Sequence, residues 1–449
     1  MIFRIDKQTL ADIDLLPNRN KNNSLFSYYN RTYTIGGNNL LYEMMQNPIS
    51  NLHRLQSRKQ EIEFFYRLDK SLELNKKNID FIEYYLRNGR APLKDNLIDA
   101  AKDSFIDKIM VDSDYYTIRQ GIIHIIHLLN ELKNFIRDSG VEDLPESLAT
   151  NVQKITDFIL IHEVSNALSD SSTDKAEPRF FVINKLDYIF REKKKTEFRE
   201  ILDIVYELDI LQSLGELMKE RNLTLPVYTG ENAPVFEGVD CFHPLLEKAI
   251  PNSFTFKHGT TLSFLTGSNM SGKSTFLKTI AVLVYLSHLG FPVPAKRLTI
   301  SIVTGLFTTI NLSDNLNLGL SHFYAEVKRI KDISTELKSN AGMVVIFDEL
   351  FRGTNVKDAY EATLMVVKSL SHIKSSMFIV SSHILEVAEN LKSSPNIDFR
   401  CFTSQILQNK PVYDFKLSVG VSTERLGMQI IKNEEIESVL ESIIMSQEK

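Results

Sequence analysis

The sequence predicts a mixed fold, in which an N-terminal all-α domain is followed by an α/β domain of the P-loop type. Up to about Leu225, apolar residues recur at helical spacing with few glycines or prolines between them. The segment that starts at Leu225, LPVYTGENAPVFEG, then brings two prolines and two glycines together. After it, short apolar runs alternate with helical ones, which is typical of an α/β domain. We therefore expect a helical domain at residues 1–225 and an α/β domain at residues 226–449.

The composition fits a globular protein. The chain has 449 residues, with 52 basic and 57 acidic side chains, a formal charge of −5 and 43% hydrophobic residues. This balance excludes disordered and collagen-like proteins, and it argues against a polybasic protein that coats nucleic acid non-specifically. Cys241 and Cys401 are the two cysteines, and they lie far apart in the sequence. We expect neither a disulfide framework nor a structural zinc site, and a reducing cytoplasm fits the chain.

No membrane role is expected. The N-terminus, MIFRIDKQTLADID, gains charges at once and lacks the apolar core of a signal peptide. The longest run without Asp, Glu, Lys or Arg, residues 279–295, is interrupted by His288, Gly290, Pro292 and Pro294. It therefore predicts a buried helix followed by a loop, and not a bilayer span.

The helical domain is predicted from apolar residues at three- and four-residue steps. Such steps run through residues 50–86, 122–136 and 201–218. The polar stretch at residues 169–178, SDSSTDKAEP, predicts a loop between helices.

Several polar residues of this half are better explained as parts of the helical fold than as catalytic or metal-binding residues. His124 and His127 lie three apart on an apolar helix, where they are better explained as packed or surface side chains than as metal ligands. The cluster REKKK at residues 191–195 fits a solvated helix face. His162 begins an HExxH pattern, but Asn166 stands at the second histidine, so a zinc protease is excluded.

A phosphate-binding loop follows the strand expected at residues 262–266, LSFLT, and precedes an apolar-periodic helix. The loop reads G-x-x-x-x-G-K-[ST], and its glycines let backbone N–H groups face phosphate oxygens at the positive end of a helix. Lys273 would bind the β- and γ-phosphates of ATP, and Ser274 would bind Mg²⁺. The predicted ATP-binding residues are Gly267, Ser268, Asn269, Met270, Ser271, Gly272, Lys273, Ser274 and Thr275.

Two further strands end in polar side chains. The apolar run at residues 343–347 leads into Asp348, which suits the Mg²⁺ shell, and Glu349, which suits a base that deprotonates the attacking water. The run at residues 377–382 delivers His383, which could hydrogen-bond the γ-phosphate. The candidate catalytic residues are therefore Glu349, Lys273 and His383, and the candidate metal ligands are Ser274 and Asp348.

The P-loop, the Asp-Glu pair and the histidine together predict an ABC-type ATPase. Such domains leave the γ-phosphate half exposed until a second copy covers it with a helix N-terminus that carries a serine. Gly319 breaks the chain, and Ser321 can cap the helix that follows. We therefore expect a homodimer in which Ser321 completes the partner's site.

These segments resemble the MutS mismatch-repair family. GSNMSGKST is similar to the family's GPNMGGKST, and residues 348–354 are similar to its DE-x-x-RGT, with Phe351 where a small residue is usual. The pair His243-Pro244 resembles the start of the family's ATPase domain, and residues 416–422 with Gly427 resemble its closing segment. The family signature D-x-x-x-x-G-x-S-x-F-x-x-E is matched by Asp314, Gly319, Ser321, Phe323 and Glu326.

The helical half is also similar to this family. Residues 24–32 and 36–48 resemble the start of its core/lever domain, and residues 207–211 resemble its return helix. The resemblance implies a dimeric, Mg²⁺-dependent ATPase that binds duplex, mismatched or branched DNA in mismatch repair or recombination. The wedge and connector domains of mismatch-detecting members are not expected here, and the clamp is expected to be missing or vestigial. After Gly427 we expect one short dimerisation helix.

Two points stay open. The levers could bind another protein and not DNA, which would make the chain a nucleotide-gated interaction module; the acidic charge and the lack of an evident basic surface favour this alternative. Ile250 and Phe254 both lie in the neighbourhood expected for adenine, and the sequence does not choose between them.

Overall fold

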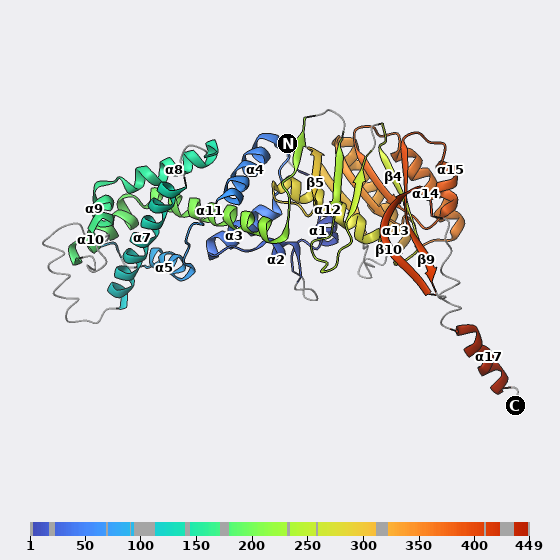
Figure 1. Cartoon of the computed structure of the whole chain (residues 1–449), viewed down its shortest axis with the longest axis horizontal. Helices are drawn as coiled ribbons and strands as arrows, with labels where there is room; N and C mark the ends of the chain where they lie inside the picture. The colour runs from blue at the N-terminus through green and yellow to red at the C-terminus, as the bar shows by residue number, and fades with distance from the viewer. Residues whose placement is uncertain are drawn as a thin grey trace. The chain divides into compact units, whose positions relative to one another are not determined.

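The computed structural model describes residues 3–17, 23–68, 71–89, 91–93, 113–139, 144–170, 179–230, 234–256, 259–310, 322–407, 410–422 and 435–447. These residues form two compact units. The sheet unit comprises Met1–Tyr28, Asn47–Gln56 and Asn222–Lys449, and the helical unit comprises Tyr29–Gln46 and Ser57–Arg221. The predicted fold class, a helical region followed by an α/β region, is confirmed (Figure 1).

Long helices occupy most of the positions that apolar periodicity predicts. Residues 122–136 lie within α7 (Ser113–Asp138), and residues 201–218 lie within α11 (Lys195–Arg221). The stretch 50–86 differs, because α4 (Leu52–Arg67) and α5 (Lys76–Leu86) are separate helices, and the side chain of Asn75 caps the second one. The described chain up to Tyr188 also contains α2 (Leu25–Tyr29), α3 (Ile35–Gln46), α8 (Glu146–Ile159), α9 (His162–Asp170) and α10 (Phe180–Tyr188), and the π-helical segment η2 (Ile189–Lys193) follows.

Buried carboxylates fix the helices of the helical unit to one another. Asp209 on α11 accepts hydrogen bonds from the backbone N (2.9 Å) and Oγ1 (2.7 Å) of Thr34, just before α3. Asp187 on α10 accepts one from Oη of Tyr85 (2.7 Å) and forms a bidentate ion pair with Arg191 at 2.6 and 2.7 Å. Buried carboxylates require such partners, so these contacts hold α11 against α3 and α10 against α5.

No helix within the described ranges is long and apolar enough to cross a bilayer. Across the same ranges, His, Cys, Asp and Glu side chains form no group of three that could hold a metal ion. The ring of His124 lies against that of Phe81, with centroids 5.3 Å apart.

A six-stranded sheet in the order β10-β9-β4-β8-β7-β6 forms the centre of the sheet unit. The strands are β4 (Leu262–Thr266), β6 (Gly305–Thr309), β7 (Met343–Asp348), β8 (Met377–Ser381), β9 (Ile397–Leu407) and β10 (Lys410–Val419). Neighbours pair in parallel except β9 and β10, which are antiparallel. The three strands predicted from apolar runs are thus present as β4, β7 and β8, and their carboxyl ends meet at one edge of the sheet.

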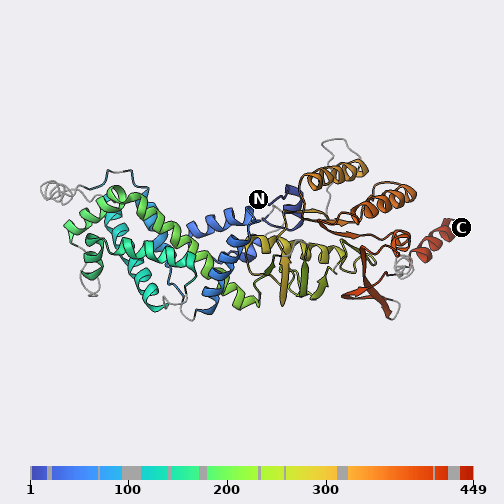
Figure 2. The same cartoon turned by 90° about the horizontal axis from the view of Figure 1, so that it is seen from above.

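Helices cover both faces of this sheet. On one face lie α13 (His322–Ser339), α14 (Val356–Leu370) and α15 (Leu385–Leu391), whose Ile333, Val367 and Leu391 share a buried cluster with Phe264 and Val345 of the strands. On the other face, α12 (Lys273–Leu289) lies between this sheet and a four-stranded sheet of order β1-β5-β2-β3 (Figure 2). Burial on both sides explains why α12 is almost uniformly apolar. The second sheet contains β1 (Val227–Thr229), β2 (Phe236–Cys241), β3 (Asn252–Thr255) and β5 (Arg297–Ser301).

The N-terminal helix α1 (Lys7–Asp12) packs against the edge strand β6, far along the sequence. Asp12, which is buried, accepts hydrogen bonds from Oγ1 of Thr308 (2.7 Å) and the backbone N of Ile310 (3.0 Å). Arg4 forms a parallel bridge with Gly305. The edge of the sheet is thereby covered, since an open edge strand would leave backbone groups without partners.

The observed division differs from the expected one at the N-terminus. The third and last segment of the sheet unit begins at Asn222, close to the boundary expected at residue 225. The described residues of 1–28 and 47–56, however, belong to the sheet unit and not to the helical unit. Most of the predicted loop at 169–178 lies outside the described residues, and α17 (Ile436–Gln447) accounts for the short helix expected after Gly427.

The buried side chain of His288, near the end of α12, predicts how stability depends on pH. Its Nδ1 donates to the carbonyl of Val284 (2.8 Å) and its Nε2 accepts from the backbone N of Val303 (2.9 Å), an arrangement that requires neutral imidazole. Burial lowers the pKa of His288 from 6.5 to about 4. The unfolded chain therefore binds a proton in this range that the folded chain does not.

Neutral His288 should stabilise the fold fully above pH 6.5, and this stabilisation should be lost as the pH falls towards 4. The total loss in the free energy of unfolding is about 3 kcal/mol. We expect His288→Gln, which keeps a donor and an acceptor but does not titrate, to flatten the pH dependence of the free energy of unfolding between these values. Urea denaturation at several pH values measures this slope. An identical slope in both proteins would assign the titration to other groups.

Candidate functional site

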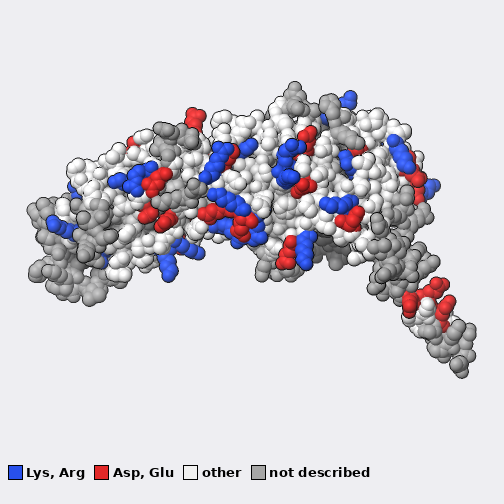
Figure 3. Space-filling model, viewed as in Figure 1, with Lys and Arg blue, Asp and Glu red and all other residues white. Residues whose placement is uncertain are grey.

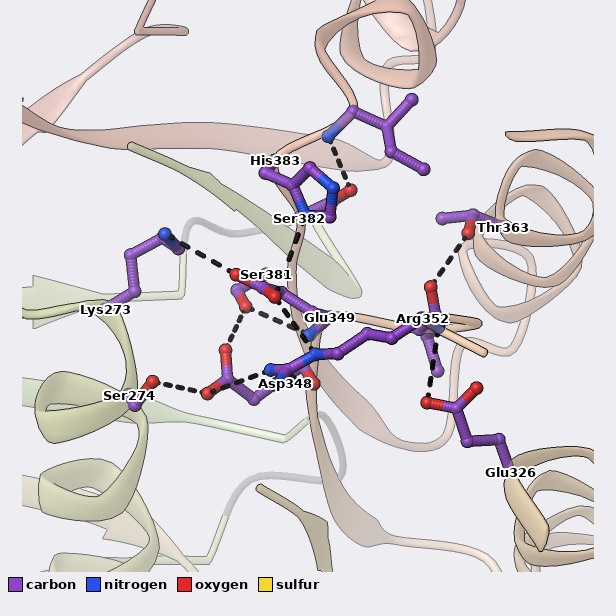
Figure 4. Close-up of polar contacts among 12 residues, drawn as sticks. Lys273, Ser274, Glu326, Asp348, Glu349, Arg352, Thr363, Ser381, Ser382 and His383 are labelled. Atoms are coloured by element: carbon purple, nitrogen blue, oxygen red, sulfur yellow. Dashed lines mark hydrogen bonds and ion pairs between the residues drawn. The ribbon is translucent and has the colours of Figure 1, made fainter. Parts of the chain in front are cut away.

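The candidate site lies where the carboxyl ends of β4, β8 and β7 meet. The loop at residues 267–272 follows β4, Glu349 follows β7, and Ser382 and His383 follow β8. These three strands are adjacent in the sheet, so segments separated by up to about a hundred residues converge at one edge. Of the predicted site residues, all but Ser321 are described, and the structure brings the charged ones together (Figure 4).

The loop has the backbone that phosphate binding requires. Gly267 and Gly272 adopt positive φ angles of 149° and 104°, and Met270 adopts 67°. A Cβ atom at Gly267 would lie 2.9 Å from Oγ of Ser271 and 3.0 Å from the carbonyl O of Phe402, so glycine is required there. Gly272 caps α12 without any side-chain hydrogen bond, which leaves the first N–H groups of a 17-residue helix directed at the pocket.

Lys273 is the first residue of α12, and its ammonium group is held inside the loop. The Nζ atom donates to the carbonyl oxygens of Gly267 (2.8 Å) and Ser268 (3.1 Å) and lies 3.7 Å from Oε1 of Glu349. Burial lowers the pKa of Lys273, and the negative charge of Glu349 opposes this effect. The loop thus presents a preorganised cation between its own carbonyl groups and an acidic side chain.

Asp348 connects the P-loop helix to the neighbouring strand. Its Oδ2 accepts a hydrogen bond from Oγ of Ser274 (2.5 Å), and its Oδ1 accepts one from Oγ of Ser381. A carboxylate and a hydroxyl facing each other are hard oxygen donors of the kind that Mg²⁺ prefers, with water and phosphate oxygens as its remaining ligands. The chemistry of this pair therefore fits the predicted metal ligands.

Glu349 lies among three basic side chains. Its Oε2 is 3.0 Å from Nε of Arg352 and 3.7 Å from Nδ1 of His383, and its Oε1 faces Lys273 (Figure 4). His383 has the largest effect on the pKa of Glu349 and lowers it, and Arg352 and Lys273 lower it further against the opposing effect of burial. Glu349 is therefore ionised at neutral pH, as a general base must be.

Arg352 is a site residue whose role the sequence did not reveal. It stands in the motif compared above, three residues after Glu349, but its side chain reaches both acidic residues: Nη2 lies 3.3 Å from the carbonyl O and 3.9 Å from Oδ2 of Asp348. The backbone N of Arg352 donates to Oε1 of Glu326 on α13 at 3.4 Å. The spacing of the arginine from Glu349 is the signal that could have indicated this contact.

A pocket of about 540 Å³ opens beside the loop, and both charged and apolar side chains line it. Lys273 and Glu349 are among its charged lining residues, with the hydroxyl of Ser274, and Ile250, Met270 and Phe415 are among its apolar ones. A Cβ atom at Gly272 would lie 3.3 Å from the ring of Phe415, so this ring sits close against the loop.

Of the two residues considered for adenine, the structure places Ile250 at the pocket. Phe254 is buried behind it, 1% exposed, with its ring 5.5 Å from that of Phe276. Phe415, which the sequence did not indicate, lies on β10 and is held by a hydrogen bond from Nδ2 of Asn252 to its carbonyl O (2.9 Å). The pairing of distant segments, and not a local pattern, brings it to the pocket.

Ser321 and the preceding signature residues Asp314 and Gly319 lie outside the described residues. The helix expected after Ser321 is present as α13, which begins at His322. The contribution of Ser321 to a partner's site stays a prediction.

Comparison with known proteins points to one family. The family model described as MutS domain V matches residues 263–447. The DNA mismatch repair protein MutS of Anaplasma phagocytophilum (strain HZ) is 30% identical over 231 residues, which are 51% of this chain and 28% of that protein. The DNA mismatch repair protein MutS of Staphylococcus aureus (strain JH9) is 27% identical over 247 residues, 54% of this chain and again 28% of the relative. The similarity thus spans about half of this chain and little more than a quarter of each relative.

The contacts around Glu349 predict how its pKa responds to substitution. His383→Ala removes the largest influence that lowers the pKa of Glu349, so this pKa should rise, while the ion pair with Arg352 keeps it from rising far. Carbon-13 NMR titration of carboxyl-labelled protein measures the change, and Glu349→Gln assigns the signal. A pKa that stays the same in His383→Ala would show that this histidine does not act on Glu349.

Proposed function

Because the C-terminal half of this chain is a MutS domain V, an ABC-type ATPase domain that places it in the MutS family, we propose that the protein is a dimeric, Mg²⁺-dependent ATPase that acts on DNA. One observation carries the proposal: Lys273, Ser274 and Glu349 come from two distant segments and line one pocket, and Ser274 donates a hydrogen bond to Asp348. Phosphate-binding, metal-binding and base functions are then available within one site.

In the proposed mechanism the residues of the loop bind and orient ATP. The N–H groups at the start of α12 and the ammonium group of Lys273 bind the phosphates, which compete with Glu349 and the loop carbonyls for Lys273. Ser274 and Asp348 would hold Mg²⁺, which supplies positive charge to the phosphates when bound. Glu349, ionised and oriented by Arg352, accepts the proton of the attacking water, and His383 stands beside it to contact the γ-phosphate.

The apolar residues that line the pocket suit the base of the nucleotide. Ile250 and Phe415 both line the pocket, and both are partly exposed, at 40% and 39%. Planar bases bind well against such side chains, because stacking removes apolar surface from water. We assign adenine to these two side chains.

A second copy would complete the site. We propose that Ser321 reaches the γ-phosphate bound by the partner, so that ATP binding and dimer formation stabilise each other. On α17 the apolar residues Ile436, Val439, Leu440, Ile443 and Ile444 are exposed, which suits the dimerisation role expected for this helix. The helical unit, Tyr29–Gln46 and Ser57–Arg221, would supply the core and levers that the dimer moves, with the clamp missing or vestigial.

The proposal of DNA as partner comes from the relatives, which are DNA mismatch repair proteins. We propose a role in repair or recombination in the cytoplasm, on duplex, mismatched or branched DNA. The alternative, a nucleotide-gated module that binds a protein, is favoured by charge: the net charge is −5, and basic and acidic side chains are interspersed on the face that Figure 3 shows.

Steady-state ATP hydrolysis with and without DNA tests this proposal. The panel comprises plain duplex, mismatched duplex, a four-way junction and single strand, and Lys273→Ala is the control for contaminating ATPase. We expect Lys273-dependent turnover that one DNA structure stimulates at least about threefold, because DNA-bound levers would favour the ATP-bound dimer. Equal turnover across the panel would leave the ATPase in place and favour the protein-binding alternative. Turnover that survives Lys273→Ala would contradict the site itself.

A further inference from the structure

The N-terminal segment forms a polar bridge between two parts of the ATPase site. It precedes the P-loop by some 250 residues, yet its side chains contact α12, the end of β6 and α13. Each contact is an ion pair or a hydrogen bond of a mostly buried carboxylate. Such bonds are directional and resist displacement more than apolar packing does, because a carboxylate separated from its partner would be left desolvated.

The first contact reaches the P-loop helix. Oδ2 of Asp14, just after α1, lies 3.1 Å from Nζ of Lys278, and both side chains are 16% exposed. Lys278 is one helical turn beyond Ser274 on α12, and this helix begins with Lys273. The phosphate-binding loop and α12 are continuous, so a group that fixes Lys278 fixes the loop as well.

The second contact reaches α13. The carboxylate of Asp6, which also caps α1, forms a bidentate ion pair with the guanidinium of Arg329, and one of its two contacts measures 3.2 Å. The same guanidinium donates to the carbonyl O of Thr308 (2.7 Å) and to Oγ1 of Thr309 (3.3 Å) at the end of β6. Between these ends, Asp12 holds the side chain of Thr308. The segment is thus fixed to β6 and to α13 together.

From α13 the contacts continue to the catalytic carboxylate. Glu326, one turn before Arg329 and buried, accepts the backbone N–H of Arg352 at 3.4 Å. The ring of Phe323, nearly one turn earlier, lies 5.8 Å from that of Phe351, which is buried at a positive φ of 61°. Arg352 in turn holds Glu349. The position of α13 therefore sets the position of the loop that carries the base.

We propose that residues 6–14 act as a brace that fixes the P-loop helix and the Glu349 loop relative to each other, with Asp14 and Asp6 as positioning residues for ATP hydrolysis. Asp14 acts through Lys278 on the phosphate-binding side, and Asp6 acts through Arg329 and α13 on the side of the base. This inference rests on the ATPase function proposed above. It assigns a role in the reaction to a segment that lies outside all the motifs.

The brace should affect the rate of the chemical step more than the binding of ATP. Most contacts to the phosphates come from the loop and the start of α12, which move as one piece, so ATP still meets the same groups when the brace is broken. The phosphates are bound on the P-loop side of the brace, and Glu349 lies on the other side, so their separation depends on the brace. A small error in the position of Glu349 relative to the phosphates slows the reaction strongly. The expected signature is a lower kcat with a nearly unchanged KM.

The test compares Asp14→Asn, Asp6→Asn and the double variant. Asparagine keeps the size of each side chain, and at position 6 it can still cap α1. We expect each single variant to lower kcat about fivefold with KM within about twofold of wild type. Since breaking either end releases the same brace, the double variant should be within about twofold of the slower single variant, whereas independent effects would multiply to about 25-fold.

The matched control is Asp332→Asn, which makes the same change at an exposed position of α13, and it should keep the wild-type kcat. The kcat values are expressed per ATP-binding site, determined by titration, so that a partly unfolded variant does not count as a slow one. Asp14→Asn leaves the positive charge of Lys278 without its ion-pair partner, which could destabilise α12. The variant Asp14→Asn/Lys278→Met removes both charges, and it should show the same kcat as Asp14→Asn.

Three results would overturn the inference: single variants with wild-type kcat, losses that multiply in the double variant, or losses that fall on KM. Wild-type protein without Lys273-dependent hydrolysis would instead contradict the proposed function, on which the brace depends. The two failures are therefore distinguishable in one set of measurements.

Discussion

The carboxylate of Asp348 is the contact on which the arrangement of the site depends. Its two oxygens accept hydrogen bonds from Ser274 on the P-loop helix and from Ser381 on β8, so one side chain at the end of β7 joins three segments. Parallel pairing of β4, β8 and β7 brings these ends together, and the carboxylate fixes their separation. The loop, the base and His383 take their places from this junction.

The balance of charge in the site explains why it can be both stable and reactive. Asp348 is buried and Glu349 is 14% exposed, and an unpaired carboxylate at such a place would be costly, but Lys273 and Arg352 lie within 4 Å of one or both of them. Phosphate groups would add negative charge beside the same cations. Binding of ATP would then redistribute existing contacts, with Lys273 released by Glu349 and bound by phosphate, and would require little movement of the backbone.

Local patterns predicted much of this site, and contacts between distant segments account for what they missed. The strand-loop-helix at residues 262–289 and the strands that lead to Asp348 and His383 were readable because strong apolar periodicity and glycine-dependent loop geometry are properties of neighbouring residues. The side-chain contacts of Arg352, the place of Phe415 at the pocket and the packing of residues 3–17 against β6 depend on tertiary structure. Ile250 and Phe254 illustrate the difference: they are four residues apart, but one lines the pocket and the other is core. Ser321 stays a prediction from the sequence.

We propose that this cluster at the strand ends binds ATP and that a second copy of the chain completes it. Sedimentation velocity of Glu349→Gln, with and without Mg²⁺ and ATP, tests it most directly, because loss of the base should leave ATP bound and uncleaved while Lys273 and Ser274 still hold it. We expect ATP to convert this variant into a dimer, and Lys273→Ala/Glu349→Gln to show no response to ATP. A Glu349→Gln protein that binds ATP and sediments as a monomer would contradict the composite site.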